Sequence, residues 1–362
     1  MHLYVHIPFC HHICPYCGFY KHKPGGLANR EFIEAILAEA KRRGAEISAP
    51  VSTIFIGGGT PSLLSRPQLE LLCTGLSDAF DLSQLEEWSL EANPKTFRLA
   101  KAKCMRELGI TRVSLGVQSF HSETLASLGR DHTPEDAVSA YETLREAGFP
   151  SVSVDLMFSI PGQNMESWKS DLDEAIRLQP DHVSAYNLTY EEDTEFLQRH
   201  ESGDLDADED RDADLFYEAI DRLEAARFRH YEISNYAQPG HESIHNRAYW
   251  AGADYLGLGP GAVSTLSNER STTLPDTAAY VKAALTGLDT RTAIETITAE
   301  DKRLERIALQ LRTREGLPLE FLPASNPVGP LIEEGLVRVS AGSLQLTRDG
   351  KALADSVAAA LV

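Results

Sequence analysis

The sequence predicts an α/β fold in which six parallel strands alternate with helices and curl into an open barrel. Short apolar or β-branched runs recur about every 30 residues, at 3–7, 53–56, 88–91, 112–117, 151–157 and 182–188. Helical patterns separate them, at 30–43, 68–80, 96–108, 134–147 and 166–178. Strand followed by helix implies a parallel sheet with helical crossovers. Because six units are fewer than the usual eight of a closed barrel, we predict a partial (β/α)6 barrel.

The chain is predicted to have three parts. The barrel takes residues 1–190, and the regular alternation stops soon afterwards, so residues 191–290 are predicted to form an α+β extension. Residues 331–339 and 343–347, with a last helix from Arg348, have the pattern of a helix, a two-stranded wing and a helix. Residues 291–362 are therefore predicted to form a small winged-helix-like C-terminal domain.

The composition is that of a soluble globular protein. Hydrophobic residues make up 42% and charged residues 24% of the 362 residues, and no run reaches the ~18 apolar residues that a membrane span needs. The first residues carry no pattern of a secretory signal, so we expect a cytoplasmic protein. A formal net charge of −20 without a run of Lys or Arg argues against nucleic acid as a partner.

Three of the five cysteines form a cluster directly after the first predicted strand. Cys10, Cys14 and Cys17 have the spacing C-x3-C-x2-C, which differs from the even, dispersed cysteines of a disulfide framework. Thiolates are the usual ligands of iron–sulfur clusters, and a [4Fe-4S] cluster normally takes four. Three cysteines leave one iron free to bind a small molecule, so we predict a cluster with an open iron.

A zinc ion is the main alternative for this cluster, with one of four nearby histidines as the fourth ligand: His6, His11, His12 or His22. Structural zinc sites usually pair two C-x2-C knuckles, and the chain supplies no second one. The iron–sulfur interpretation is therefore favoured. Cys73 and Cys104 fall within helical patterns and are predicted to be ordinary core thiols.

Six motifs resemble a known family, the radical S-adenosylmethionine proteins related to oxygen-independent coproporphyrinogen III oxidase. They lie at residues 4–20, 55–62, 91–94, 114–120, 128–132 and 154–163. The resemblance implies that S-adenosyl-L-methionine (SAM) binds the open iron. It also implies that SAM is contacted by residues that follow or line the strands: Tyr4, Tyr16, Gly58, Gly59, Thr60, Glu91, Gln118, Arg130 and Asp155. The chemistry suits SAM, because carboxylates accept from ammonium and hydroxyl groups and arginine pairs with a carboxylate.

The family has an oxidase branch and a heme-chaperone branch, and three features favour the second. Phe19 stands where the oxidase has a fourth cysteine, and the oxidase's segment before the cluster is missing. Residues 245–250 carry the H-N-x-x-Y-W pattern of the chaperone branch. The resemblance then implies a cytoplasmic protein, transiently associated with the membrane, that binds heme and delivers it to respiratory membrane proteins, with a homodimer as a further option.

His245 is the first candidate for the axial ligand of heme, because a neutral imidazole suits heme iron. A hydrogen-bonded histidine packed in a loop is the competing interpretation, and His241, Tyr231 and Cys104 are other candidate ligands. The alternative function is oxidative decarboxylation of coproporphyrinogen III by the oxidase mechanism.

Overall fold

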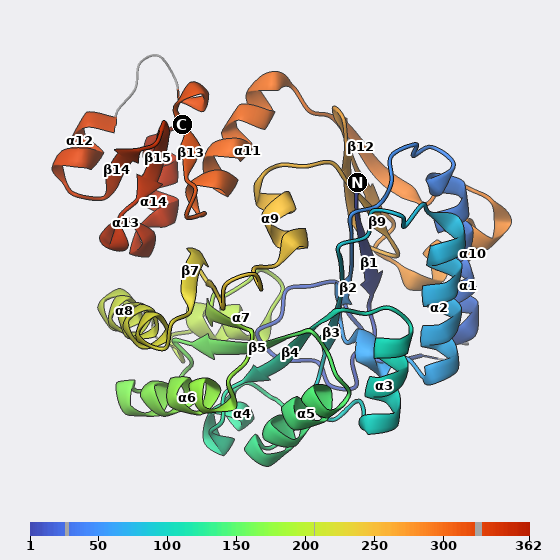
Figure 1. The fold of residues 1–362 in the computed structure, drawn as a ribbon, viewed down its shortest axis with the longest axis horizontal. Helices are drawn as coiled ribbons and strands as arrows, with labels where there is room; N and C mark the ends of the chain where they lie inside the picture. The colour runs from blue at the N-terminus through green and yellow to red at the C-terminus, as the bar shows by residue number, and fades with distance from the viewer. Residues whose placement is uncertain (26–28, 206, 323–327) are drawn as a thin grey trace.

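A computed structural model describes residues 1–25, 29–205, 207–322 and 328–362. One sheet of 12 strands dominates it, in the order β12-β11-β10-β9-β1-β2-β3-β4-β5-β6-β8-β7 (Figure 1). The six predicted strands are all present and pair in parallel in chain order, as β1 (His2–Ile7), β2 (Thr53–Gly58), β3 (Glu87–Ala92), β4 (Arg112–Gln118), β5 (Ser151–Phe158) and β6 (His182–Asn187). The predicted open α/β barrel is therefore confirmed.

Six further strands, which the sequence patterns did not predict, extend the sheet at both edges. Beside β1 lie β9 (Tyr255–Leu258), β10 (Val263–Leu266), β11 (Glu269–Thr273) and β12 (Arg291–Thr296). Beside β6 lie β8 (Asn235–Ala237) and β7 (Arg229–Glu232). The segment with β9 and β10 is rich in glycine for a steric reason: a Cβ on Gly257 would lie 2.2 Å from the Val263 carbonyl oxygen.

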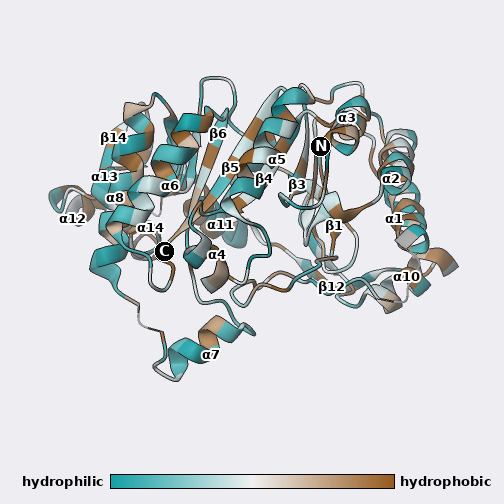
Figure 2. Cartoon of the chain, turned by 90° about the horizontal axis from the view of Figure 1, so that it is seen from below, coloured by the Kyte–Doolittle hydropathy of each residue, from teal (hydrophilic) through white to brown (hydrophobic). Residues whose placement is uncertain are grey.

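Helices cover the outer face of the sheet (Figure 1). They are α1 (Asn29–Gly44), α2 (Arg66–Ala79), α3 (Leu99–Glu107), α5 (Pro134–Glu146), α6 (Met165–Leu178), α8 (Glu209–Ala225) and α10 (Thr277–Thr286). Side chains cap the starts of some of these helices: Thr133 accepts from the Asp136 N–H, and Asn164 accepts from the Ser167 N–H. The short helix α7 (Glu195–Glu201) stands apart from this layer (Figure 2).

Alternation along each strand separates an apolar face from a polar one. In β1, Leu3, Val5 and Ile7 are fully buried beneath the helices, while the residues between them point to the concave side. The concave side therefore carries the polar groups of the barrel. Because the carboxyl ends of parallel strands meet at one edge, side chains that follow these strands are brought together there.

Helix α9 (Ile244–Trp250) lies on the concave side of the sheet (Figure 1) and closes its N-terminal end. The carboxylate of Glu87, at the start of β3, accepts hydrogen bonds from the backbone N–H groups of Ile244 and His245, both at 3.1 Å. It also accepts one from the Ser243 hydroxyl at 3.3 Å. These bonds hold the start of α9 against the base of the barrel.

The C-terminal region has its own core and a sheet of three strands, in the order β13-β15-β14. It contains the predicted helix, wing and helix as α12 (Val328–Glu333), β14 (Val337–Ser340), β15 (Ser343–Leu346) and α13 (Arg348–Ala352). Before them come α11 (Ala299–Leu311) and β13 (Leu317–Pro318), with η2 (Leu319–Phe321), and α14 (Ala354–Ala360) ends the fold. The small winged-helix-like domain is confirmed, whereas the boundaries 190/191 and 290/291 stay predictions.

Candidate functional site

The three clustered cysteines lie on a loop that leaves the carboxyl end of β1. The Cys10 N–H donates to the His22 carbonyl at 3.0 Å, and the His22 N–H donates to the Pro8 carbonyl at 2.9 Å, which closes the loop at its base. Within it, the Cys17 N–H donates to the Cys14 carbonyl at 3.3 Å. Backbone bonds thus hold all three thiols on one short, closed segment.

Polar groups from two other segments, and one from within the loop, contact it. The Thr60 hydroxyl donates to the Cys10 sulfur at 3.6 Å, Arg130 donates to the Cys14 sulfur at 3.7 Å, and Lys21 donates to the Cys17 carbonyl. Among the residues described, no three His, Cys, Asp or Glu side chains are grouped closely enough to hold a single metal ion.

A pocket of 370 Å³ opens at this loop. It is lined by eight of the residues that the sequence analysis assigns to the cluster or to SAM: Cys10, Cys14, Tyr16, Cys17, Gly58, Gly59, Thr60 and Arg130. Lys21, Asn93 and Lys95 also line it and were not predicted. Tyr16 packs against Phe196 of α7, with ring centroids 6.2 Å apart, so α7 supports one wall of the pocket.

Two glycines at the end of β2 are required by close contacts. Gly58 has a φ of +109°, and a Cβ there would lie 2.4 Å from the imidazole of His6. A Cβ on Gly59 would lie 2.8 Å from the Phe9 carbonyl oxygen, directly before the cysteine loop. Both positions therefore exclude side chains, which leaves bare backbone facing the pocket for a ligand to approach.

Glu91, at the end of β3, is partly buried beside this glycine turn. Its carboxylate accepts a hydrogen bond from the Gly58 N–H at 3.0 Å, and burial raises the pKa of Glu91 to about 8. The hydroxyl of Tyr4 lies 2.9 Å from the Nδ1 of His6, two residues further along β1. A buried carboxyl whose ionised form lacks a cation is suited to receive one from a ligand.

Arg130 has a buried donor without a partner. Its Nη2 donates to the Gly116 carbonyl at 2.8 Å and its Nη1 to the Cys14 sulfur, but its Nε finds no hydrogen-bond acceptor. An unsatisfied buried guanidinium nitrogen is costly unless an anionic group meets it. Together with the glycine turn and the carboxyl of Glu91, this donor fits an amino acid moiety with its carboxylate at Arg130.

Gln118 stands in a strained backbone conformation at the end of β4, with a φ of +69°. Asp171 of α6 holds the residues that follow, because its carboxylate accepts from the Ser119 hydroxyl at 2.9 Å and from the Phe120 N–H at 2.5 Å. Asp171 is fully buried, and this burial raises its pKa to about 6. Asp171 was not predicted from the sequence, because no motif marks it as a partner of the turn after β4.

We expect Asp171→Ala to lower the free energy of unfolding by about 3 kcal/mol, because it leaves two buried donors without an acceptor. Denaturant unfolding measures the change. Asp173→Ala on the same helix is the matched control: its carboxylate is 62% exposed and pairs with Arg222, so its loss should cost less than about 1 kcal/mol. Equal losses in the two variants would contradict the role assigned to Asp171.

Asp155 lies on β5, deeper in the barrel, within hydrogen-bonding distance of serine hydroxyls. Ser114 donates to it at 2.6 Å and Ser153 at 2.8 Å. Burial raises the pKa of Asp155, and the hydroxyl donors oppose this shift. The polar–apolar alternation of residues 151–156 is the sequence signal that could have predicted that Ser153 and Asp155 face the same side of the sheet.

His245 is not near the cysteine loop. It lies at the start of α9, where its Nδ1 is 2.7 Å from the Thr53 hydroxyl, at the N-terminal end of β2. The parallel strands rise about 17 Å between this end and the cysteine edge. His245 is 7% exposed, its ring packs against Phe55 with centroids 5.2 Å apart, and burial lowers its pKa to about 3.

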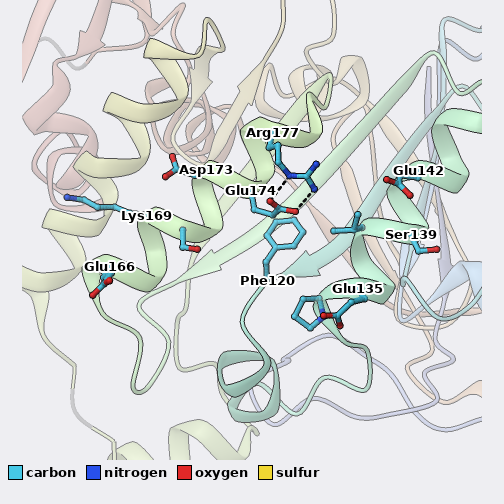
Figure 3. Close-up of a pocket in the computed structure, with 12 residues that line it drawn as sticks. Phe120, Glu135, Ser139, Glu142, Glu166, Lys169, Asp173, Glu174 and Arg177 are labelled. Carbon is cyan, nitrogen blue, oxygen red and sulfur yellow. Dashed lines mark hydrogen bonds and ion pairs between the residues drawn. The ribbon is translucent and has the colours of Figure 1, made fainter.

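A larger hollow of 880 Å³ lies on the outer surface between α5 and α6 (Figure 3). Phe120 forms part of its lining, and its remaining residues are mostly charged, including the Glu174–Arg177 ion pair at 2.5 Å. None of the residues predicted to bind the cluster, SAM or heme line it. The hollow is therefore separate from the candidate site. In the described part of the chain, no helix is both long and apolar enough to cross a membrane.

Comparisons with known proteins show which family models and solved structures the chain resembles. Residues 4–175 match the Radical SAM superfamily, and residues 297–353 match the HemN C-terminal domain. The solved structure of the coproporphyrinogen III oxidase HemN from Escherichia coli superposes with a TM-score of 0.85 at 24% identity, over 99% of this chain and 89% of that one. The fold and the cysteine site thus define a radical SAM protein.

Relatives of higher sequence identity show to which family of radical SAM proteins the chain belongs. The chain is 38% identical to the heme chaperone HemW of Lactococcus lactis, over 88% of this chain and 83% of that protein. It is 33% identical to the HemW of Bacillus subtilis over 98% and 97%, and 37% identical to that of Mycobacterium tuberculosis over 99% and 94%. The chain belongs to the HemW family.

Proposed function

We propose that the protein is a heme chaperone that binds heme and a SAM-ligated [4Fe-4S] cluster and delivers heme to respiratory membrane proteins. The observation that carries the proposal is the identity of 33% to 38% with proteins named heme chaperone HemW, over most of this chain. Phe19 adds support, because this 70% exposed side chain stands where the oxidase branch has a cysteine. A homodimer and transient membrane association belong to the same proposal.

In this proposal Cys10, Cys14 and Cys17 hold the cluster. The guanidinium of Arg130 pairs with the carboxylate of SAM, and the carboxylate of Glu91 pairs with its ammonium group. In each pair the side chain supplies the charge opposite to that of the SAM group. When bound, the cluster supplies an electron to SAM. The remaining predicted contacts, from Tyr4, Tyr16, Gly58, Gly59, Thr60, Gln118 and Asp155, orient the ligand and exclude water.

His245 is the proposed axial ligand of heme. Its imidazole is neutral, as iron requires, but its Nδ1 is engaged with Thr53 and its ring is buried. Ligation therefore requires the start of α9 to move away from the base of the barrel. His241, Tyr231 and Cys104 stay alternative candidates for the heme ligand.

Heme titration monitored by the Soret band tests the heme site. We expect His245→Ala to abolish the Soret shift that the wild type shows, and His241→Ala to retain it. Thr53→Val removes the hydrogen bond that holds the His245 ring in place, so it should tighten heme binding about fivefold. Unchanged spectra in His245→Ala would exclude this histidine as the ligand.

Oxidation of coproporphyrinogen III is the second candidate function, and the close superposition with the Escherichia coli oxidase favours it. The anaerobic assay with reconstituted cluster, SAM and coproporphyrinogen III separates the two. We expect saturable heme binding without decarboxylation. Turnover of the porphyrinogen would contradict a function limited to heme transfer.

A further inference from the structure

A chain of hydrogen bonds runs through the interior of the barrel from Asp155 to the start of α9. The Ser153 hydroxyl lies 2.8 Å from the Asp155 carboxylate and 2.8 Å from the Nδ1 of His182. The Nε2 of His182 lies 2.8 Å from the hydroxyl of Tyr231, which accepts the Ser243 N–H at 3.2 Å. These five residues come from β5, β6, β7 and the residue that caps α9.

The donors and acceptors fix a single direction for this chain. Ser153 donates its one hydrogen to the carboxylate of Asp155, so its oxygen must accept the Nδ1–H of His182. Neutral His182 then has a bare Nε2, which accepts the hydroxyl hydrogen of Tyr231. The oxygen of Tyr231 is left to accept the backbone N–H of Ser243. Every hydrogen in the chain is used once, and each points toward Asp155.

Water cannot substitute easily for these partners. Ser153 is 1% exposed, His182 2%, Tyr231 4% and Ser243 2%. Burial and the nearby guanidinium of Arg112 lower the pKa of His182 well below its usual value, which keeps the imidazole neutral. In such an environment a broken hydrogen bond is not replaced, and neighbouring bonds reinforce one another.

The hydrogen-bonded chain of side chains also connects to the C-terminal part of the molecule. The backbone carbonyl of Tyr231 accepts the Arg314 N–H at 3.0 Å, directly after α11. The carboxylate of Glu232, the next residue, accepts from the Nε of Arg312 at 2.9 Å. The strand that holds the Tyr231 hydroxyl is thus held from both sides, by the start of α9 and by the residues that follow α11.

We propose that His182 and Tyr231 are positioning residues of the SAM site, which fix the orientation of Asp155 and connect it to α9. The inference rests on the proposed contact between Asp155 and SAM. Neither residue touches the ligand; each acts through the next hydrogen bond. Without the Tyr231 hydroxyl, His182 is free to change tautomer or rotate, and Ser153 loses the donor that directs its own hydrogen to the carboxylate.

Tyr231→Phe in the cluster-loaded protein tests the proposal through the dissociation constant of SAM, measured by equilibrium dialysis. We expect about tenfold weaker binding, the effect of one buried hydrogen bond, with unchanged iron content. Tyr236→Phe is the matched control on the adjacent strand, because the Tyr236 hydroxyl is buried without a partner and its removal should leave SAM binding unchanged. Ser153→Ala, which breaks the same chain closer to Asp155, should weaken SAM binding as Tyr231→Phe does.

A double-mutant cycle distinguishes positioning from a general structural effect. In an Asp155→Ala background, Tyr231→Phe should no longer change SAM affinity, because the acceptor of the Ser153 hydroxyl is gone. Equal weakening with and without Asp155, or an equal effect of Tyr236→Phe, would overturn the proposal. Normal SAM affinity in Asp155→Ala would instead remove the proposed contact on which it rests, and failure of the wild type to bind SAM would refute the proposed function itself.

Discussion

Cys14→Ala is expected to abolish the iron–sulfur cluster. Each thiolate binds one iron, so two cysteines cannot hold the cubane that three hold, and the iron and sulfide content of the anaerobically reconstituted protein should fall to background. The broad visible absorption of the cluster and the binding of SAM should disappear with it. Cys14 is only partly buried, so the apoprotein is expected to keep its fold.

Cys73→Ala provides the matched control for this loss. Cys73 is 1% exposed within α2, far along the chain from the cysteine loop, and its thiol packs in the main core. Its replacement should cost some stability but leave the iron content unchanged. Full iron loading in Cys14→Ala would disprove the proposed ligand set, and one equivalent of zinc in the wild type would restore the zinc alternative.

Gly58→Ala is expected to weaken SAM binding by roughly 100-fold. The new methyl group would lie 2.4 Å from the His6 ring, which is held by the Tyr4 hydroxyl and by the Tyr20 carbonyl at 2.8 Å. Either the ring or the end of β2 must shift, and the N–H that Gly58 donates to Glu91 shifts with it. SAM titration of the cluster-loaded variant measures the effect.

Gly148→Ala separates the steric contact from backbone strain. Gly148 also has a positive φ, of +78°, but a Cβ there meets nothing within 4 Å. Both variants therefore carry the cost of a left-handed alanine, about 1 kcal/mol, and only Gly58→Ala adds the collision with His6. Equal SAM affinity in the two variants would show that the close contact at the end of β2 is unimportant for the ligand.

Local patterns were sufficient to predict the barrel and the cysteine loop. Each of the six strands is an apolar run bounded by turns, and the spacing of Cys10, Cys14 and Cys17 is readable without tertiary information. Strands β7 to β12 were missed because they are short or exposed: β12, for example, is an edge strand that pairs only with β11 among the described strands, and five of its residues are exposed. Their pairing with the main sheet, rather than their own composition, makes them strands.

The sequence by itself determined the fold class, the ligand spacing of the cluster loop and the membership of the family, because these depend on residues close together along the chain. Only the tertiary structure decided which distant residues support the site. Asp171 reaches the turn after β4 across 52 positions, and Tyr231 reaches His182 across 49. It also decided that His245 packs at the base of the barrel, because a hydrogen bond to Thr53 across 192 positions exists only once the sheet has formed.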